Sequence, residues 1–203
     1  MKTVIINIGR QFGSGGKSIA ARIGSMLDIP VYDYELIDKA AEASGLSASL
    51  FHSNDEKKKL WSLGSIFGSN RYGSFTNNSI NESELFRIQS DTIRSIAESG
   101  SAIFVGRASD YVLRDMDCLD VFICAPKENR IERVSERNGI SPEEAEAMIE
   151  EKDRSREDYY NFFTFGNWGV ASNYDLCVDS SILGIEGTAQ FIVDFARKAG
   201  KTE

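Results

Sequence analysis

Residues 8–18 read Ile8-Gly9-Arg10-Gln11-Phe12-Gly13-Ser14-Gly15-Gly16-Lys17-Ser18, and this stretch decides the fold class. The apolar run before it, Thr3–Ile8, predicts a buried strand. The run after it, Lys17–Leu27, places apolar residues three and four positions apart, which predicts a helix. A strand, a glycine-rich turn and a helix in this order point backbone N–H groups into one small volume at the positive end of the helix dipole. The stretch therefore predicts an anion site that suits phosphate oxygens.

The turn matches most of the phosphate-binding pattern G-x-x-x-x-G-K-[ST]. In that pattern the backbone of residues 13–16 holds the phosphates of a nucleotide and Lys17 neutralises the β- and γ-phosphates. The Ser18 hydroxyl would ligate Mg²⁺. The first glycine of the pattern is replaced here by Gln11.

Because of this replacement, two other interpretations of the turn stay open. A dinucleotide-binding turn would begin Gly13-x-Gly15 and use Asp33 as its ribose-binding acid, although its third glycine would be Ser18. The turn would otherwise have a structural role only.

Four further apolar or β-branched runs have the length of strands, at Val31–Tyr32, Ala102–Val105, Asp120–Cys124 and Leu176–Val178. Helical patterns occur between them, at Tyr34–Ser44, Glu82–Glu98 and Pro142–Glu157. The last pattern follows a serine cap, with proline at the first helical position and glutamate three residues after the cap. The alternation predicts an α/β fold, a five-stranded parallel sheet with helices on both faces.

Length and charge narrow the class of protein. The 203 residues suit a single domain over 1–203, and 31 acidic against 23 basic side chains give a formal net charge of −8. A negative field repels polyanions, so we expect no nucleic acid polymer as a partner. No apolar run approaches the length of a membrane span, and the apolar start Val4-Ile5-Ile6 soon meets the glycine turn. We therefore expect no membrane association and a cytoplasmic location.

The cysteine and histidine content excludes other chemistries. Cys118, Cys124 and Cys177 are odd in number and lack CxxC spacing, which predicts reduced core thiols. The only histidine, His52, stands in a polar stretch, so a histidine-dependent hydrolase has no support.

Two stretches interrupt the alternation of strands and helices. Residues 62–81 are rich in Gly, Ser and Asn, which predicts a mobile surface insertion. The stretch Tyr159–Trp168 is rich in aromatic residues, which would stack on a base, pack a lid or form a contact in a homodimer.

Several motifs together resemble the cytidylate kinase-like branch of the P-loop nucleoside monophosphate kinases over nearly the whole chain. These motifs are Arg10–Lys17, Tyr32–Ile37, Val105–Leu113, Asp158–Tyr160, Trp168 and Tyr174–Ser180. The resemblance implies ATP as donor, Mg²⁺ as cofactor and a nucleoside monophosphate as acceptor. It also implies an acceptor-side insertion at 46–81 and a helical lid at 127–170.

The cations of the chain fit this resemblance. Arg107 follows a buried strand at its carboxyl end, where ligands bind in open α/β sheets, and would grip the acceptor phosphate. Arg130, Arg154 and Arg156 resemble the lid arginines that stabilise developing charge on the transferred phosphoryl group. For each arginine an ordinary ion pair with a neighbouring carboxylate is the alternative.

The carboxylate candidates are Asp33 and Asp110. Asp33 would hold Mg²⁺ through water, orient the acceptor, or only cap the helix that follows it. Asp110 would contact the substrate or balance Arg107. Cytidylate kinases proper have an aspartate before the Gly-Arg pair after the third strand, and here this place is Val105.

We therefore expect an enzyme that transfers phosphoryl from ATP to a nucleoside monophosphate, CMP or dCMP above all. Two alternatives stay open: a nucleotide-binding regulatory module without catalysis, and a kinase for a small metabolite that is not a nucleotide.

Overall fold

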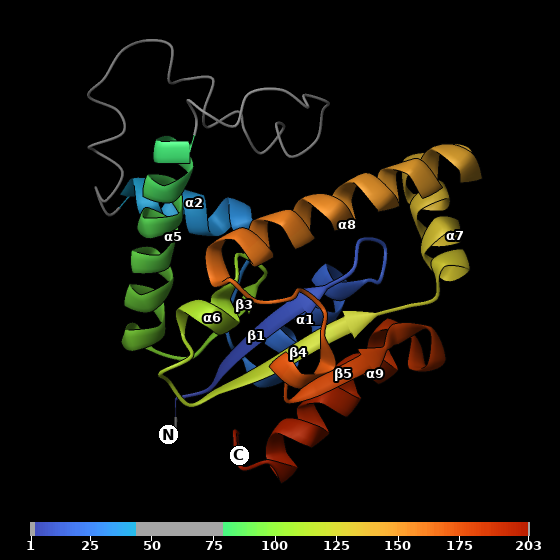
Figure 1. Ribbon diagram of the computed structural model, residues 1–203. Coiled ribbons are helices and arrows are strands. Elements are labelled where there is room, and N and C mark those ends of the chain that lie inside the picture. Colours follow the sequence, from blue (N-terminus) through green and yellow to red (C-terminus); the bar gives the residue numbers. More distant parts are fainter. Residues whose placement is uncertain (1–2, 44–78, 203) are drawn as a thin grey trace.

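The computed structural model describes residues 3–43 and 79–202 (Figure 1). Its centre is a five-stranded sheet with the strand order β2-β3-β1-β4-β5. Every strand pair is parallel, so the carboxyl ends of all the strands meet at one edge of the sheet. The strands are β1 (Ile5–Arg10), β2 (Val31–Tyr32), β3 (Ala102–Val105), β4 (Cys118–Cys124) and β5 (Leu176–Asp179).

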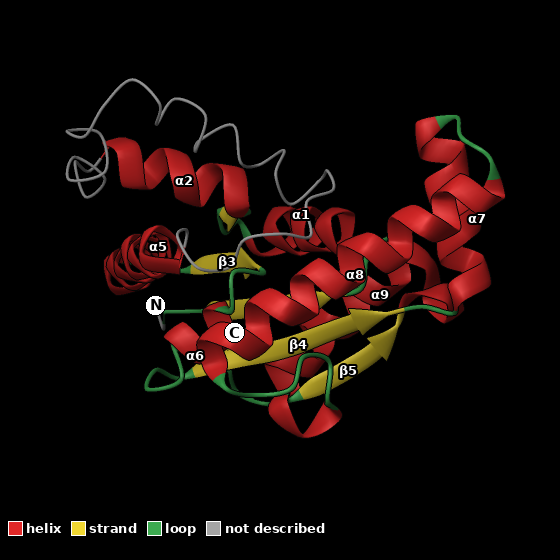
Figure 2. Cartoon of the chain, turned by 45° about the horizontal axis from the view of Figure 1, so that its top comes forward, coloured by secondary structure: helices red, strands yellow, loops and turns green. Residues whose placement is uncertain are grey.

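Helices cover both faces of the sheet, as the alternation predicts (Figure 2). One face packs on α1 (Gly16–Leu27) and α9 (Ser180–Lys198), whose apolar residues share a core with Ile6 and Ile8. The other face packs on α2 (Tyr34–Ala43), α5 (Ser79–Ser99) and α6 (Ser109–Val112), with Ile5 and Phe104 in that core. Successive β1 residues thus serve opposite cores, because side chains alternate along a strand.

Two helices, α7 (Lys127–Asn138) and α8 (Pro142–Thr164), extend beyond the carboxyl end of β4 (Figure 1). The capping box expected at Ser141 is present, since Ser141 Oγ accepts from Glu144 N and Glu144 Oε2 accepts from Ser141 N. α8 is longer than the expected Pro142–Glu157 and runs back across the sheet until Phe163 stacks on Phe86 of α5, 4.2 Å between ring centroids. This return brings the charged stretch 152–156 over the carboxyl edge of the sheet.

The structure also bears on the expected insertion at 62–81 and on the expected core thiols. The expected insertion lies outside the described residues, apart from 79–81, which begin α5. The three cysteines are free, but only Cys118 is buried, so the prediction of core thiols is wrong for Cys177, which is exposed on edge strand β5. Within 3–43 and 79–202 no helix combines the length and apolar character that a membrane crossing requires.

Candidate active site

The glycine-rich turn joins β1 to α1 and owes its shape to two residues with positive φ. Gly13 has φ 80° and Gly15 has φ 81°, a conformation that side chains with a Cβ rarely adopt. A Cβ on Gly15 would also collide with the Ile185 side chain of α9. Ser14, between them, is fully buried, and its carbonyl accepts a hydrogen bond from Ser180 Oγ at 2.6 Å. The start of α9 therefore fixes the position of the glycine-rich turn through this hydrogen bond.

The amides of this turn are open to a ligand. Among residues 3–43 and 79–202, no acceptor pairs with the backbone N–H groups of Gly13, Gly15, Gly16, Lys17 and Ser18. Three of these residues begin α1, where the helix dipole adds positive charge. This is the donor set that the phosphate-binding interpretation requires.

Gln11 replaces the first glycine of the pattern and fixes the turn to the sheet. Its backbone N–H donates to the carbonyl of Ile123 at 3.0 Å, and its side-chain Oε1 accepts from Ala125 N at 3.2 Å. These bonds tie the turn to the end of β4, so the departure from the pattern is a structural substitution.

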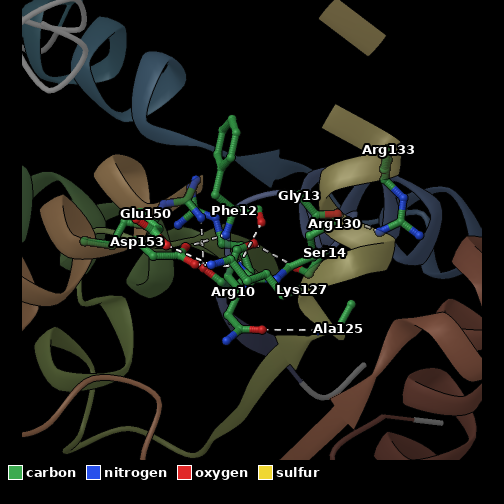
Figure 3. Close-up of polar contacts among 12 residues, drawn as sticks. Arg10, Phe12, Gly13, Ser14, Ala125, Lys127, Arg130, Arg133, Glu150 and Asp153 are labelled. Carbon is green, nitrogen blue, oxygen red and sulfur yellow. Dashed lines mark hydrogen bonds and ion pairs between the residues drawn. The ribbon is translucent and has the colours of Figure 1, made fainter. Parts of the chain in front are cut away.

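Two arginines of α7, Arg130 and Arg133, contact the outer side of the turn (Figure 3). Arg133 Nη1 donates to the carbonyl of Gly13 at 2.6 Å. Arg130 Nη1 lies 2.5 Å from Asp153 Oδ2 and donates to the carbonyl of Phe12 at 3.3 Å, while Phe12 N donates to Asp153 Oδ1 at 2.6 Å. Arg130 is 8% exposed, its Nη1 makes both of these contacts, and its Nε is buried without a partner among the described residues. In this conformation the two arginines connect α7 and α8 to the turn.

Lys17 and Asp33 form an ion pair beside the turn, with 2.6 Å between Nζ and Oδ2. Asp33 Oδ1 also accepts from Leu36 N at 3.2 Å, so the carboxylate caps α2 as well. Burial raises the pKa of Asp33, but the hydrogen bonds from Lys17 and from backbone amides outweigh it and leave the pKa below its usual value. The bond from Leu36 N shows the capping role expected for Asp33, while its two other expected roles, holding Mg²⁺ through water and orienting the acceptor, stay predictions.

A cavity of about 250 Å³ opens beside the turn, at the carboxyl ends of β1 and β3 and under α8. Its charged walls are cationic except for one carboxyl group. The basic residues that line it are Arg10, Arg107, Lys152 and Arg156, and the acid is Asp110. The aromatic residues that line it are Phe12, Tyr34, Tyr159, Tyr160, Trp168 and Tyr174. A cationic, aromatic-lined cavity in a chain of net charge −8 is suited to a flat organic anion.

Arg107 is held at the cavity wall by Tyr34 and Tyr159, with its Cζ 5.5 Å from each ring centroid. Its Nη2 lies 3.7 Å from Asp38 Oδ2, and its Nε is buried without a partner among the described residues. Arg107 has φ 58°, an uncommon backbone conformation for a side-chain-bearing residue. The guanidinium is thus positioned, and part of its hydrogen-bonding capacity is unused.

Asp110 has a partner other than the expected Arg107. Its Oδ2 accepts from the Tyr160 hydroxyl at 2.7 Å, and burial raises the pKa of the carboxyl group.

The aromatic residues of the stretch Tyr159–Trp168 fall into two groups. Tyr159, Tyr160 and Trp168 line the cavity, whereas Phe162 and Phe165 are exposed.

The structure brings some of the expected lid residues together and separates others. Arg156 lies over Phe12 and donates from Nη1 to the carbonyl of Arg10 at 2.9 Å. Arg154, two residues earlier on α8, is exposed and does not line the cavity. Arg10, for which no role was predicted, also lines the cavity, and its place at the start of the glycine-rich stretch was the signal that could have identified it.

The fold and the site together define a class: a parallel α/β domain with a glycine-rich phosphate turn after its first strand and a cationic cavity at the strand ends. A model of the cytidylate kinase-like family matches residues 5–182. The chain belongs to the cytidylate kinase-like family.

Three individual proteins illustrate what this chain is similar to. A cytidylate kinase of Pyrobaculum calidifontis is 24% identical over 193 residues, which cover 95% of this chain and 92% of that protein. A solved structure of an uncharacterized protein from Eubacterium ventriosum has a TM-score of 0.72 at 28% identity, with 97% of this chain and 99% of the other covered. A shikimate kinase from Bacteroides thetaiotaomicron shares the fold, with a TM-score of 0.55 at 14% identity over 96% of this chain and 99% of its own. The kinase relatives support a phosphotransferase.

Proposed function

We propose that this protein transfers the γ-phosphoryl group of ATP to a nucleoside monophosphate, with CMP or dCMP as the preferred acceptor. The observation that carries the proposal is the adjacency of two anion sites. The amides of the glycine-rich turn lie on one side of Arg10, and the cationic cavity that Arg107 and Arg156 line lies on the other. A monophosphate kinase needs two phosphate groups held next to each other and in line for transfer.

On the donor side, the amides of Gly13 and of residues 15–18, which have no acceptor among the described residues, bind the β- and γ-phosphates, and Lys17 adds an exposed cation. The Lys17 side chain is 70% exposed, so it can leave Asp33 for a phosphate oxygen without first leaving a buried position.

The oxygen ligands available for Mg²⁺ here are the Ser18 hydroxyl and the Asp33 carboxylate. Mg²⁺ usually takes one or two protein oxygens and fills its other positions with phosphates and water, so this small set fits. Within residues 3–43 and 79–202 there is no cluster of three or more His, Cys or acidic groups that would bind a metal without the nucleotide. When bound, Mg²⁺ neutralises charge on the donor phosphates.

On the acceptor side, Arg107 and Arg156 bind the monophosphate and the aromatic walls take the base. The Arg107 guanidinium, which lines the cavity, supplies donors for the phosphate oxygens. The Asp110 carboxyl group, fixed by Tyr160, faces the same cavity and offers an acceptor to an exocyclic amino group, which cytosine has and uracil lacks. The names of the curated relatives agree with this preference.

The test is a titration of the purified protein with ATP and Mg²⁺ against a panel of monophosphates, following both heat and ADP release. We expect ADP release with CMP and dCMP at a kcat/KM at least tenfold above that with UMP, AMP or GMP. Binding without ADP release from any acceptor would contradict the enzyme and favour a regulatory module. Turnover with a metabolite panel and none with nucleotides would contradict the acceptor class.

A further inference from the structure

Arg10, the last residue of β1, extends its side chain from the glycine-rich turn to the acceptor cavity. Its stem packs on the first residue of α1, because a Cβ built on Gly16 would lie 2.7 Å from Arg10 Cβ and 2.9 Å from Cγ. Its guanidinium lies at the end of β3, where a Cβ on Gly106 would collide with Nη1. Both glycines leave the space that this one side chain fills. The guanidinium therefore stands between the open amides of the turn and the cavity.

The guanidinium of Arg10 has no carboxylate of its own. Among residues 3–43 and 79–202 it forms no ion pair and donates no hydrogen bond, although Arg10 lines the cavity. The bond from Arg156 to Arg10 is accepted by the backbone carbonyl, at 2.9 Å, and leaves the guanidinium unengaged. Five N–H donors thus face a space that a ligand can enter.

The surroundings of Arg10 penalise its charge. Burial lowers the pKa of Arg10 most, and the neighbouring cations Arg156 and Arg107 lower it further. An arginine stays protonated in proteins, so the folded chain carries this unpaired cation at a cost in stability. A residue with only a structural role would have a partner, whereas a bound phosphate group would supply the missing negative charge.

Accepting the proposed function, we infer that Arg10 is a catalytic residue that contacts the phosphoryl group during its transfer. An oxygen of the acceptor monophosphate, entering as the dianion, forms a bond to the γ-phosphorus of ATP. The bond from that phosphorus to the β–γ bridging oxygen breaks, its electron pair stays on ADP, and no proton is lost. The three equatorial oxygens of the moving group pass between turn and cavity, where the Arg10 fork donates to them. An interaction made at this point lowers the barrier more than it strengthens ground-state binding.

The experiment uses Arg10→Met, which keeps an apolar stem on Gly16, and Arg10→Lys, which keeps the charge without the fork. Arg114→Ala is the matched control, because Arg114 is exposed and its side chain contacts only the carbonyl and the ring of nearby Tyr111 among the described residues. We expect both Arg10 variants to lower kcat about 10³-fold, with the KM values for ATP and acceptor changed less than fivefold. Added guanidinium should restore part of the activity of Arg10→Met, and the control should match the wild type.

Two further measurements separate a catalytic role from a structural one. The affinity for ADP with aluminium fluoride and CMP, a mimic of the transferring group, should fall about as much as kcat, while the affinity for ADP alone stays within threefold. The Tm of Arg10→Met should equal or exceed that of the wild type, because the variant removes an unpaired buried charge. An unchanged kcat, or a Tm loss that accounts for the lost activity, would overturn the inference.

Failure of the proposed function has a different signature. If the wild type turned over no acceptor, the reaction would be wrong, and Arg10 would then be judged by calorimetric titration with inorganic pyrophosphate. Binding at least tenfold weaker in Arg10→Met than in the wild type would retain Arg10 as a phosphate ligand. Equal binding would remove it.

Discussion

Lys17 Nζ and Asp33 Oδ2 lie 2.6 Å apart and connect the start of α1 to the start of α2. The two partners differ in exposure, because the lysine side chain is 70% exposed and the aspartate side chain 10%. The hydrogen bond to Asp33 raises the pKa of Lys17 and keeps the amine charged. The pair therefore joins a nearly buried carboxylate to an exposed cation beside the glycine-rich turn.

Replacing the exposed partner should affect turnover far more than stability. We expect Lys17→Ala to lower kcat/KM about 10²–10³-fold, because the variant removes one cation that stabilises the charge of the transferring group. The Tm should fall by no more than about 3 °C, because the lysine is 70% exposed and the nearly buried Asp33 carboxylate keeps its hydrogen bond from Leu36 N.

Arg22→Ala is the control for this change, since Arg22 belongs to the same helix and forms an exposed pair with Glu186. Steady-state kinetics of both variants measure kcat/KM, and thermal unfolding measures the Tm. Near-wild-type turnover of Lys17→Ala would remove Lys17 from the mechanism.

Two arginines of α8 offer a matched comparison. Arg156 lines the cavity and contacts Phe12, whereas Arg154 is exposed and outside it. We expect Arg156→Ala to lower kcat/KM for the acceptor at least 100-fold and Arg154→Ala to change it less than threefold. A large loss in Arg154→Ala would mean that α8 rotates during catalysis and brings this arginine to the phosphates.

A half-buried carboxyl group on β4, that of Asp120, should make stability depend on pH. Burial raises the pKa of Asp120 to about 6, although the bond from Asn7 Nδ2 at 2.8 Å opposes this rise. Between about pH 4 and pH 6 the folded chain binds a proton that the unfolded chain releases, so stability falls as pH rises through this window.

Asp120→Asn keeps the hydrogen bond and removes the charge. We expect it to match the wild type near pH 4 and to exceed it at pH 7 by about 1–2 kcal/mol. The full effect of about 3 kcal/mol is discounted here for partial exposure. Urea unfolding across this pH range measures the difference, and a gap that did not change with pH would show that Asp120 is not responsible.

The hydrogen bond from Ser180 to the glycine-rich turn should contribute to stability and to nucleotide binding. Ser180 Oγ is fully buried and donates to the Ser14 carbonyl at 2.6 Å. Ser180→Ala leaves that carbonyl without a partner, which should cost about 1–3 kcal/mol and raise the KM for ATP.

Ser25→Ala removes a similar hydroxyl-to-carbonyl bond, from Ser25 Oγ to Ala21, at an exposed position. Its cost should stay below about 0.5 kcal/mol, because water replaces the lost partner. Equal losses in the two serine variants would mean that the bond to Ser14 does not support the turn.

The local elements were predictable because their signals lie within short windows. Short runs of apolar and β-branched residues predicted all five strands to within two residues at each end, and the cap at Ser141 predicted the start of α8. Helix ends are harder, and α8 passes the expected end at Glu157 because its aromatic residues pack on α5, a contact absent from the local pattern.

The sequence by itself determined the α/β alternation, the glycine-rich turn after the first strand and the supply of cations, since these depend on periodicity and on residue type. Only the tertiary structure decided which cations share a cavity. It separates Arg154 from Arg156, engages Arg130 with Asp153 and gives the Arg10 guanidinium no ion pair or hydrogen bond within residues 3–43 and 79–202. The physical reason is that a charge is paired or free according to what the fold packs within a few ångströms of it, and those neighbours come from distant parts of the chain.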